Sequence, residues 1–243
     1  MRNKKVVLVT GASSDIGIEL ISKVAESYSL IIAQYLHLND KLKLLKEKYG
    51  DKIILIKANL LFDDDVDKII CIINQNGIVV DHVVHLTALK AVNSQFRKES
   101  WNQVTDHMAV SVKSIYRLLQ EILPKMVKQK YGKVVFLLTS YLDGVPPKYQ
   151  SSYVISKYAL LGLMKSLSVE YIDYGITVNS VSPDMIETKF LEDLPHWVPE
   201  QNAKKSLLGR NFTVDDIVPA FQYLLSDGAN AVTGLNMVIN NKL

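Results

Sequence analysis

Short apolar runs alternate along the chain with longer stretches of helical character, and this alternation restricts the possible folds more than any other feature. The expected strands are residues 6–9, 30–35, 53–58, 82–86, 134–138, 176–181 and 237–239. The expected helices are residues 16–26, 40–49, 64–75, 101–127, 152–174 and 214–225. Each strand is almost continuously apolar, as strands covered on both faces are. The pattern predicts an α/β fold, a doubly wound parallel sheet of about seven strands with helices on both faces.

No linker, repeat or low-complexity segment interrupts this alternation, so residues 1–243 are expected to form a single domain. The exception is the segment of residues 187–210, between the sixth expected strand and the last expected helix, which lacks clear periodicity. A stretch of that length is more often a lid or a binding segment than a passive connection. We therefore expect a substrate lid at about residues 187–210.

Charge and composition argue against several classes of protein. The formal net charge is only +3 and is spread evenly, which does not suit nucleic-acid binding. The single cysteine, Cys71, lies in an apolar run and is interpreted as a buried thiol in a reducing compartment, not as a metal ligand. The apolar run at residues 6–9 is too short for a signal peptide or a membrane span. We expect a cytoplasmic protein that binds no metal, nucleic acid or membrane.

The first expected strand runs directly into the sequence Thr-Gly-Ala-Ser-Ser-Asp-Ile-Gly at residues 10–17. A strand, a tight glycine turn and a helix amino terminus present free N–H groups and a partial positive charge to a pyrophosphate. An ordinary strand-to-helix turn is the alternative, but the position in the first unit of the chain favours a nucleotide site. The predicted contacts are Gly11, Ser13, Ser14, Asp15, Ile16 and Gly17.

The end of the second expected strand bears on the choice of dinucleotide. In such folds an acidic residue about 20 positions after the glycine loop binds the ribose 2′-hydroxyl of NAD. Residues 35–39 contain no acid that would repel a 2′-phosphate, and His37, Asn39 and Lys41 could meet that phosphate. An ordinary loop histidine is the alternative interpretation of His37. NADP(H) is therefore favoured, and NAD(H) stays open because no arginine is present.

Tyr153 and Lys157 are four residues apart and lie on one face of an expected helix. Such a pair alone is a weak signal. Its position adds specificity, because the pair opens the helix that follows the fifth expected strand, and Ser140 ends that strand 13 residues before Tyr153.

Serine, tyrosine and lysine at this spacing resemble the active site of the short-chain dehydrogenase/reductase family, and the resemblance runs the length of the chain. Residues 10–17 are similar to its Thr-Gly-x-x-x-Gly-x-Gly fingerprint, residues 179–188 to its nicotinamide segment, and residues 215–217 and 233–234 to its carboxyl-terminal pattern. The resemblance implies a Rossmann-type NAD(P)-binding domain, similar to the 3-oxoacyl-(acyl carrier protein) reductases.

The resemblance also implies roles for individual residues. Tyr153 would protonate the carbonyl oxygen, Ser140 would donate a hydrogen bond to the same oxygen, and Lys157 would bind the nicotinamide ribose. A free tyrosine has a pKa of about 10, and the Lys157 ammonium is expected to lower it towards neutral. The further cofactor contacts implied are Asn59, Leu60, Thr87, Ala88, Val110, Pro183, Ile186 and Thr188.

Several positions depart from the family pattern and mark a divergent member. Asp15 replaces the middle glycine of the fingerprint, and its carboxylate would repel a pyrophosphate unless it capped the helix instead. His-Leu-Thr-Ala at residues 85–88 replaces Asn-Asn-Ala-Gly, and Asp184 replaces a glycine. Ser111 stands where the family's fourth catalytic residue, an asparagine, spans a helix irregularity. We expect weakened cofactor binding and a slow but competent enzyme.

The leading hypothesis is an NADP(H)-dependent oxidoreductase that transfers a hydride between the nicotinamide and a carbonyl or secondary alcohol, with 3-oxoacyl thioesters as candidates. Lys130 keeps one basic docking position for an acyl carrier protein, but Tyr174 stands where another would be. A weak or inactive nucleotide-binding sensor or scaffold is the alternative, and a sugar-nucleotide epimerase or dehydratase rests on residues 85–88 alone. The resemblance implies a homotetramer or homodimer formed through residues 101–127 and 152–174.

Overall fold

Seven parallel strands form one sheet in the order β3-β2-β1-β4-β5-β6-β7. The computed structural model describes residues 5–91, 93–192 and 197–240, so residues 193–196 of the expected lid lie outside the described residues. The strands are β1 (Val6–Thr10), β2 (Leu30–Tyr35), β3 (Ile53–Lys57), β4 (His82–His85), β5 (Gly132–Leu137), β6 (Ile176–Pro183) and β7 (Asn236–Ile239). The predicted doubly wound α/β architecture is confirmed.

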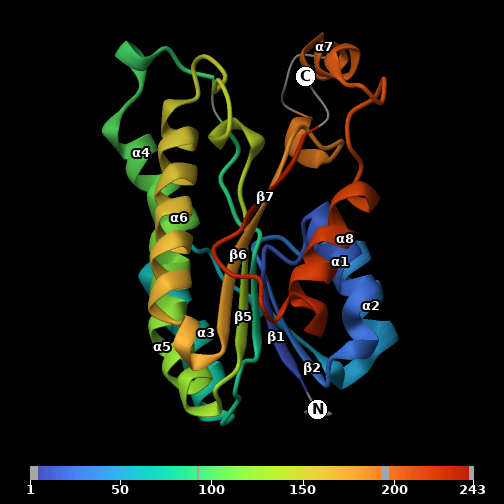
Figure 1. Ribbon diagram of the computed structural model, residues 1–243, viewed down its shortest axis with the longest axis vertical. Helices are drawn as coiled ribbons and strands as arrows, with labels where there is room; N and C mark the ends of the chain where they lie inside the picture. Colours follow the sequence, from blue (N-terminus) through green and yellow to red (C-terminus); the bar gives the residue numbers. More distant parts are fainter. Residues whose placement is uncertain (1–4, 92, 193–196, 241–243) are drawn as a thin grey trace.

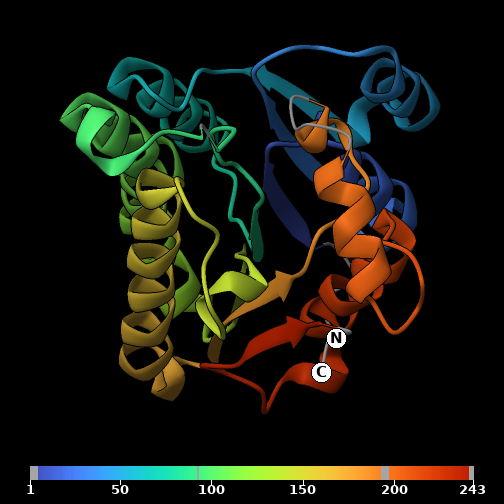
Figure 2. The same ribbon diagram turned by 90° about the horizontal axis from the view of Figure 1, so that it is seen from above.

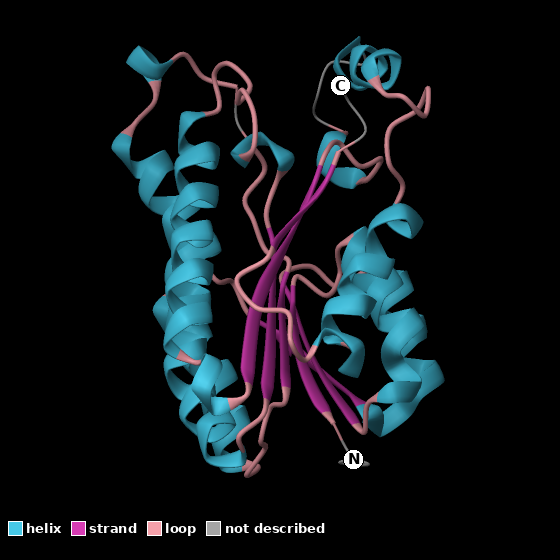
Figure 3. Ribbon diagram, viewed as in Figure 1, coloured by secondary structure: helices cyan, strands magenta, loops and turns pink. Residues whose placement is uncertain are grey.

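Helices cover both faces of this sheet (Figures 1 and 3). The α-helices are α1 (Asp15–Val24), α2 (Asp40–Tyr49), α3 (Asp63–Gln75), α4 (Trp101–Met108), α5 (Ser114–Gln129), α6 (Ser151–Glu170), α7 (Trp197–Lys205) and α8 (Val214–Leu225). Helices α1, α2 and α8 lie on one face, and α3, α5 and α6 on the other. Side chains of a strand alternate between these layers: Val83 of β4 belongs to the α3–α5–α6 core, whereas Val84 belongs to the α1–α2–α8 core. This two-sided burial explains why the strands are almost continuously apolar.

The order of the strands places a switch point between β1 and β4. Strand β1 pairs with β2 on one side and with β4 on the other, so the connections after β1 and β4 diverge to opposite faces of the sheet. In open parallel sheets a ligand crevice forms at the carboxyl ends of such strands. The segments that follow β1, β4, β5 and β6 all meet at this edge.

Two sequence expectations need correction. The helix expected over residues 101–127 is interrupted, because a π-helical turn (Ala109–Lys113) separates α4 from α5. Cys71 is exposed, so the interpretation as a buried thiol was wrong. On α3 the buried side chains are those of Val66, Ile69 and Ile73. Cys71 follows Ile69 by two residues and therefore points about 200° away from it around the helix, towards solvent.

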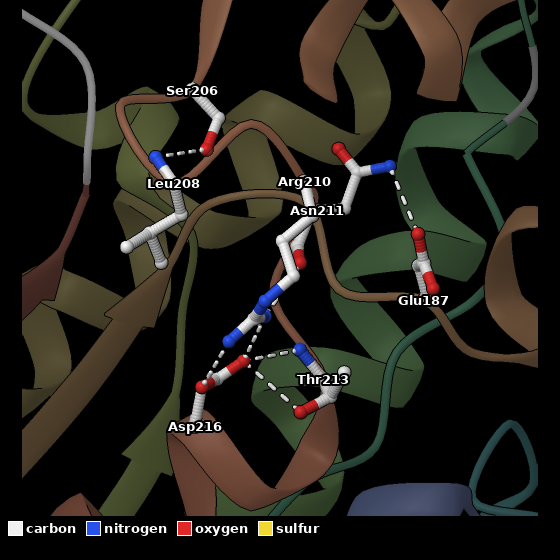
Figure 4. Close-up of polar contacts among 7 residues, drawn as sticks. All are labelled: Glu187, Ser206, Leu208, Arg210, Asn211, Thr213 and Asp216. Carbon is white, nitrogen blue, oxygen red and sulfur yellow. Dashed lines mark hydrogen bonds and ion pairs between the residues drawn. The ribbon is translucent and has the colours of Figure 1, made fainter. Parts of the chain in front are cut away.

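The described parts of the expected lid, residues 187–192 and 197–210, are more ordered than their sequence suggested. They contain a 3₁₀ turn (Lys189–Leu191) and helix α7, which stands on the opposite side of the strand ends from α6 (Figure 2). The two ends of the lid are joined at the base, because the N–H of Glu187 donates to the carbonyl of Phe212 (2.8 Å). Arg210 adds a two-pronged ion pair with Asp216 at 2.6 and 2.9 Å (Figure 4). The segment therefore starts and ends at one fixed point beside the sheet.

None of the helices within the described parts of the chain is long and apolar enough to cross a membrane.

Candidate active site

A cavity of about 550 Å³ opens at the carboxyl ends of the central strands. Its walls come from segments that are far apart in the sequence: the loop after β1, residues 86–88 after β4, residues 137–139 at the end of β5, the start of α6, and the segment after β6. The predicted site residues that line it are Gly11, Ser13, Ser14, Asp15, Ile16, Thr87, Ala88, Tyr153, Lys157, Pro183, Ile186 and Thr188. Most of the predicted site is thus brought together in one place.

The loop after β1 is held in a fixed shape. Gly11 has a φ of +72°, a conformation that disfavours other residues, and its N–H donates to Oε1 of buried Gln34 (2.8 Å). Ser14 caps α1, since its hydroxyl oxygen accepts from the N–H of Gly17 (3.1 Å). A Cβ on Gly17 would lie 2.6 Å from the carbonyl oxygen of Gly11, so this helix can approach the loop only with glycine there. Gly11 thus permits the turn of the loop, and Gly17 lets α1 pack close to it.

Asp15 does not cap α1. It is the first residue of the helix, and its carboxylate accepts a hydrogen bond from the backbone N–H of Lys189 (2.9 Å). The Nζ of Lys41 lies 3.8 Å from the same carboxylate. The negative charge of Asp15 therefore lies at the amino terminus of α1, where it links the glycine loop after β1 to the 3₁₀ turn that begins at Lys189.

The adenosine end of the predicted site is less complete. The side chain of Asn39 already has two hydrogen bonds within the protein. Its amide oxygen accepts from the N–H of Leu42 (2.9 Å) and caps α2, and its amide nitrogen donates to the carbonyl of Ser13 (2.8 Å). The side chain of Asn59 likewise accepts from a neighbouring backbone N–H. Leu36 lines the cavity at this end. Within the described residues, the cavity lining does not include Gly17, His37, Asn59, Leu60 or Val110.

Tyr153 and Lys157 lie one turn apart on α6, are both buried and both line the cavity. The Nζ of Lys157 is 5.7 Å from the centre of the Tyr153 ring and donates a hydrogen bond to the carbonyl of Leu137 (2.8 Å). The ring of His107, from α4, packs edge-on against the Tyr153 ring with centroids 6.3 Å apart. The phenol is therefore enclosed, with an amine as its near neighbour.

The electrostatics of this pair correct one expectation. Burial raises the pKa of Tyr153 above its usual value, and a hydrogen bond from Thr139 only partly offsets this effect. Burial also lowers the pKa of the Lys157 ammonium to about 8. The expected lowering of the tyrosine pKa by Lys157 was wrong for this structure, because burial of the phenol, which disfavours its charged form, is the largest influence on this pKa.

Two adjacent residues with hydroxyl side chains, Thr139 and Ser140, precede Tyr153 in the sequence, and the structure gives them different contacts. Thr139 lines the cavity, and its hydroxyl lowers the pKa of the Tyr153 phenol. Ser140 does not end β5 but begins a 3₁₀ turn, and its hydroxyl donates to Oδ1 of Asp184 at 3.5 Å. Sequence reasoning missed Thr139. The signal available in the sequence was that two neighbouring residues, Thr139 and Ser140, both carry hydroxyls. In an extended backbone such neighbours point to opposite sides, so either one could face the cavity.

Ser111 lies in the π-helical turn, so the helix irregularity implied by the resemblance is present at this residue. Its hydroxyl is buried and has no hydrogen-bond partner among the described residues. Its carbonyl lies 3.1 Å from Nε2 of His85, whose Nδ1 lies 2.7 Å from the Thr10 hydroxyl. Burial lowers the pKa of His85 to about 3, so the ring is neutral and can donate to Ser111 while accepting from Thr10. His85 thereby ties the end of β1 to the π-helical turn.

Residues 11–241 match the family model described as enoyl-(acyl carrier protein) reductase. The chain is 28% identical over 242 residues to a 3-oxoacyl-[acyl-carrier-protein] reductase FabG of Staphylococcus epidermidis, with 97% of each chain covered. It is 29% identical over 245 residues to nodulation protein G of Rhizobium meliloti, covering 96% of this chain and 94% of that protein.

Solved structures share the fold. Levodione reductase superposes with a TM-score of 0.87 at 20% identity, covering 98% of this chain and 96% of the other. A 4-hydroxyisoleucine dehydrogenase complexed with NADH gives 0.89 at 23% identity, with 98% of both chains covered. Together with the glycine loop after β1 and the Tyr153–Lys157 pair, the match of the family model over residues 11–241 shows that this chain belongs to the short-chain dehydrogenase/reductase family of NAD(P)-dependent oxidoreductases.

Proposed function

We propose that the protein is an NADP(H)-dependent reductase of a carbonyl group, with Tyr153 as the proton donor. The observation that carries this proposal is the placement of buried Tyr153 and Lys157 in the same cavity as the glycine loop at the start of α1. The cavity volume of about 550 Å³ lies within the range of roughly 300–1,000 Å³ that is typical of ligand sites. The nicotinamide, when bound, would supply the hydride.

Two features support the fit of a dinucleotide. Gly11 lines the cavity in a left-handed turn (φ +72°), and Gly17 lets the amino terminus of α1 pack directly against that loop. The hydroxyl of Thr87 lines the cavity, is buried, and has no hydrogen-bond partner among the described residues, so it is available to a ligand. Gly11, Ser13, Ser14 and Ile16 would hold the pyrophosphate. Lys157 would hold the nicotinamide ribose, and Pro183, Ile186 and Thr188 the nicotinamide carboxamide.

The protonation state of the pair favours reduction. A tyrosine whose pKa lies above its usual value keeps its proton at neutral pH and can give it to a carbonyl oxygen that gains negative charge. The Tyr153 O–H bond breaks as the new alcohol O–H bond forms. Lys157, with a pKa of about 8, can then return a proton to the phenolate near neutral pH. Two residues are candidates for the hydroxyl that hydrogen-bonds the reacting oxygen. Ser140 is implied by the family resemblance, and Thr139 is favoured by its influence on Tyr153.

The cofactor preference and the lid are part of the same proposal. Leu36 lines the cavity where an acid would repel a 2′-phosphate, which supports NADPH over NADH. Residues 187–210 would act as the substrate lid, since Phe190 and Leu191 line the cavity and the rings of Phe190 and Tyr153 lie 6.4 Å apart. The printed names of the sequence relatives make 3-oxoacyl thioesters one candidate substrate class.

The test is NADPH oxidation by the purified protein against a panel of ketones and 3-oxoacyl thioesters, with NADPH and NADH binding measured by calorimetry. We expect turnover in the wild type, and a loss of about 10²- to 10⁴-fold in Tyr153→Phe with cofactor affinity nearly unchanged. Leu36→Asp should shift binding towards NADH. Binding of NADPH without turnover of any carbonyl would instead support the nucleotide-binding sensor.

A further inference from the structure

The buried carboxylate of Asp184 lies in the wall of the cavity that contains Tyr153 and Lys157. Its side chain is only 6% exposed, and it lines the cavity together with Thr139, Tyr141 and Tyr153. Its backbone N–H donates to the carbonyl of Ile239 at the end of β7 (2.9 Å), so the residue is anchored to the sheet. The carboxylate is therefore a fixed part of the cavity.

The two carboxylate oxygens point to different elements. Oδ1 accepts from the hydroxyl of Ser140 and Oδ2 from the side-chain amide of Asn202 on α7, each at 3.5 Å. Burial raises the pKa of Tyr141, and the negative charge of Asp184 raises it further. Asp184 thus stands between the turn after β5 and the lid, and its charge reaches a second cavity side chain.

The neighbouring hydroxyls divide between two positions in the cavity. Thr139 lowers the pKa of the Tyr153 phenol, while the next residue, Ser140, bonds to Asp184. A carbonyl compound held at Tyr153 would therefore share the cavity with the Asp184 carboxylate. A buried carboxylate needs hydrogen-bond donors, and a hydroxyl or an ammonium supplies one where a methyl group does not.

From this placement we propose that Asp184 is a specificity-determining residue that selects carbonyl compounds with a hydroxyl or amino group on the carbon next to the carbonyl. This inference rests on the proposed carbonyl reduction. A site that hydrogen-bonds a substrate donor rejects the analogue that lacks it far more strongly than an apolar pocket rejects a missing methyl group. Asp184 acts on substrate choice, and proton donation remains with Tyr153.

The experiment compares three ketones of one skeleton: 3-hydroxybutan-2-one, 3-aminobutan-2-one and 3-methylbutan-2-one. We expect kcat/KM with NADPH to be at least about tenfold higher for the two donor-bearing ketones than for the methyl analogue. In Asp184→Gly this ratio should fall to about one for both donors. In Asp184→Asn the hydroxyl preference should survive in part, and the ammonium preference should be lost, because an amide carries no charge.

Asp143→Asn is the matched control, since Asp143 is an exposed carboxylate next to the same turn and lies outside the described cavity lining. Thermal unfolding and NADPH calorimetry on each variant check that fold and cofactor site persist. The inference is overturned if the wild type and Asp184→Gly give equal ratios of kcat/KM between the donor-bearing ketones and the methyl analogue. It is also overturned if the wild type prefers 3-oxoacyl thioesters to all three ketones. In both cases the proposed carbonyl reduction stands. NADPH binding without turnover of any carbonyl overturns both.

Discussion

The hydroxyl of Thr139 lowers the pKa of the buried Tyr153 phenol, although the family pattern assigns the neighbouring serine to this part of the site. Burial would otherwise raise this pKa further, so Thr139 stabilises the phenolate that forms when the proton leaves.

Thr139→Val removes this hydroxyl while keeping the shape of the side chain. We expect kcat to fall by about 10²-fold, within the range for loss of one preorganised donor, with NADPH affinity unchanged. Ser140→Ala should cost less on a simple ketone, since its hydroxyl donates to Asp184. Steady-state kinetics with both variants make the comparison, and a larger loss in Ser140→Ala would return the role to the serine.

Asp15→Gly should bind NADPH more tightly, by about tenfold, because it removes a carboxylate from the helix amino terminus that would hold the pyrophosphate. The same change should lower thermal stability slightly, since Asp15 favours the α1 dipole and bonds to the N–H of Lys189. Asp15→Asn removes the negative charge but keeps an oxygen that can accept the hydrogen bond from Lys189, so it separates the effect of charge from that of hydrogen bonding. Calorimetry at low and high salt measures the affinity, and an affinity that does not rise in either variant would contradict the repulsion.

The family resemblance implies that an asparagine at position 111 holds a water that connects the active-site lysine to solvent. Ser111→Asn should therefore raise turnover a few-fold, because the buried serine hydroxyl cannot reproduce both contacts of the amide. Ser111→Ala should lower turnover with cofactor affinity roughly unchanged. Single-turnover and steady-state rates distinguish the chemical step from resupply of the proton. If both variants match the wild type in turnover, Ser111 has no part in proton transfer.

Acid should destabilise the fold through its buried histidines. Burial lowers the pKa values of His82 and His85 to about 3, so the unfolded chain binds more protons than the folded chain below pH 6.5. Stability is therefore fully present above about pH 6.5 and is lost as the pH falls towards 3, at up to about 1.4 kcal/mol per pH unit for each histidine. Urea unfolding between pH 7.5 and 5 measures the slope. His85→Asn should make the slope shallower, and an unchanged slope would exclude His85 as a contributor.

Self-association is expected through α5 and α6, which expose Tyr116, Ile155, Tyr158 and Val169. Light scattering should give a homotetramer or homodimer of the 27.3 kDa chain. Tyr158→Glu combined with Val169→Lys should lower this mass, because charges oppose burial of the surface. Leu44→Glu, at an exposed apolar position on α2, should not change it. A monomeric wild type at micromolar concentration would contradict the prediction.

Local features of the sequence determined the architecture and the position of the site. The alternation of apolar strands and helices predicts the parallel sheet because buried strands must be apolar on both faces. Gly11 and Gly17 mark the loop, since only glycine permits that turn and that close approach. Tyr153 and Lys157 share a face because of the helical repeat alone. Each of these inferences depends on neighbours within a few positions in the chain.

Tertiary structure decided what depends on distant segments. Asp15 meets the N–H of Lys189, 174 positions away in sequence, and no local pattern indicates that contact. The choice between Thr139 and Ser140 depends on how the chain turns after β5, and the raised pKa of Tyr153 depends on burial from several elements at once. Cys71 is exposed because of the rotational phase of α3, which composition does not specify. Residue types and spacing therefore establish which chemical groups are present, whereas packing establishes which of them meet and how strongly water is excluded from them.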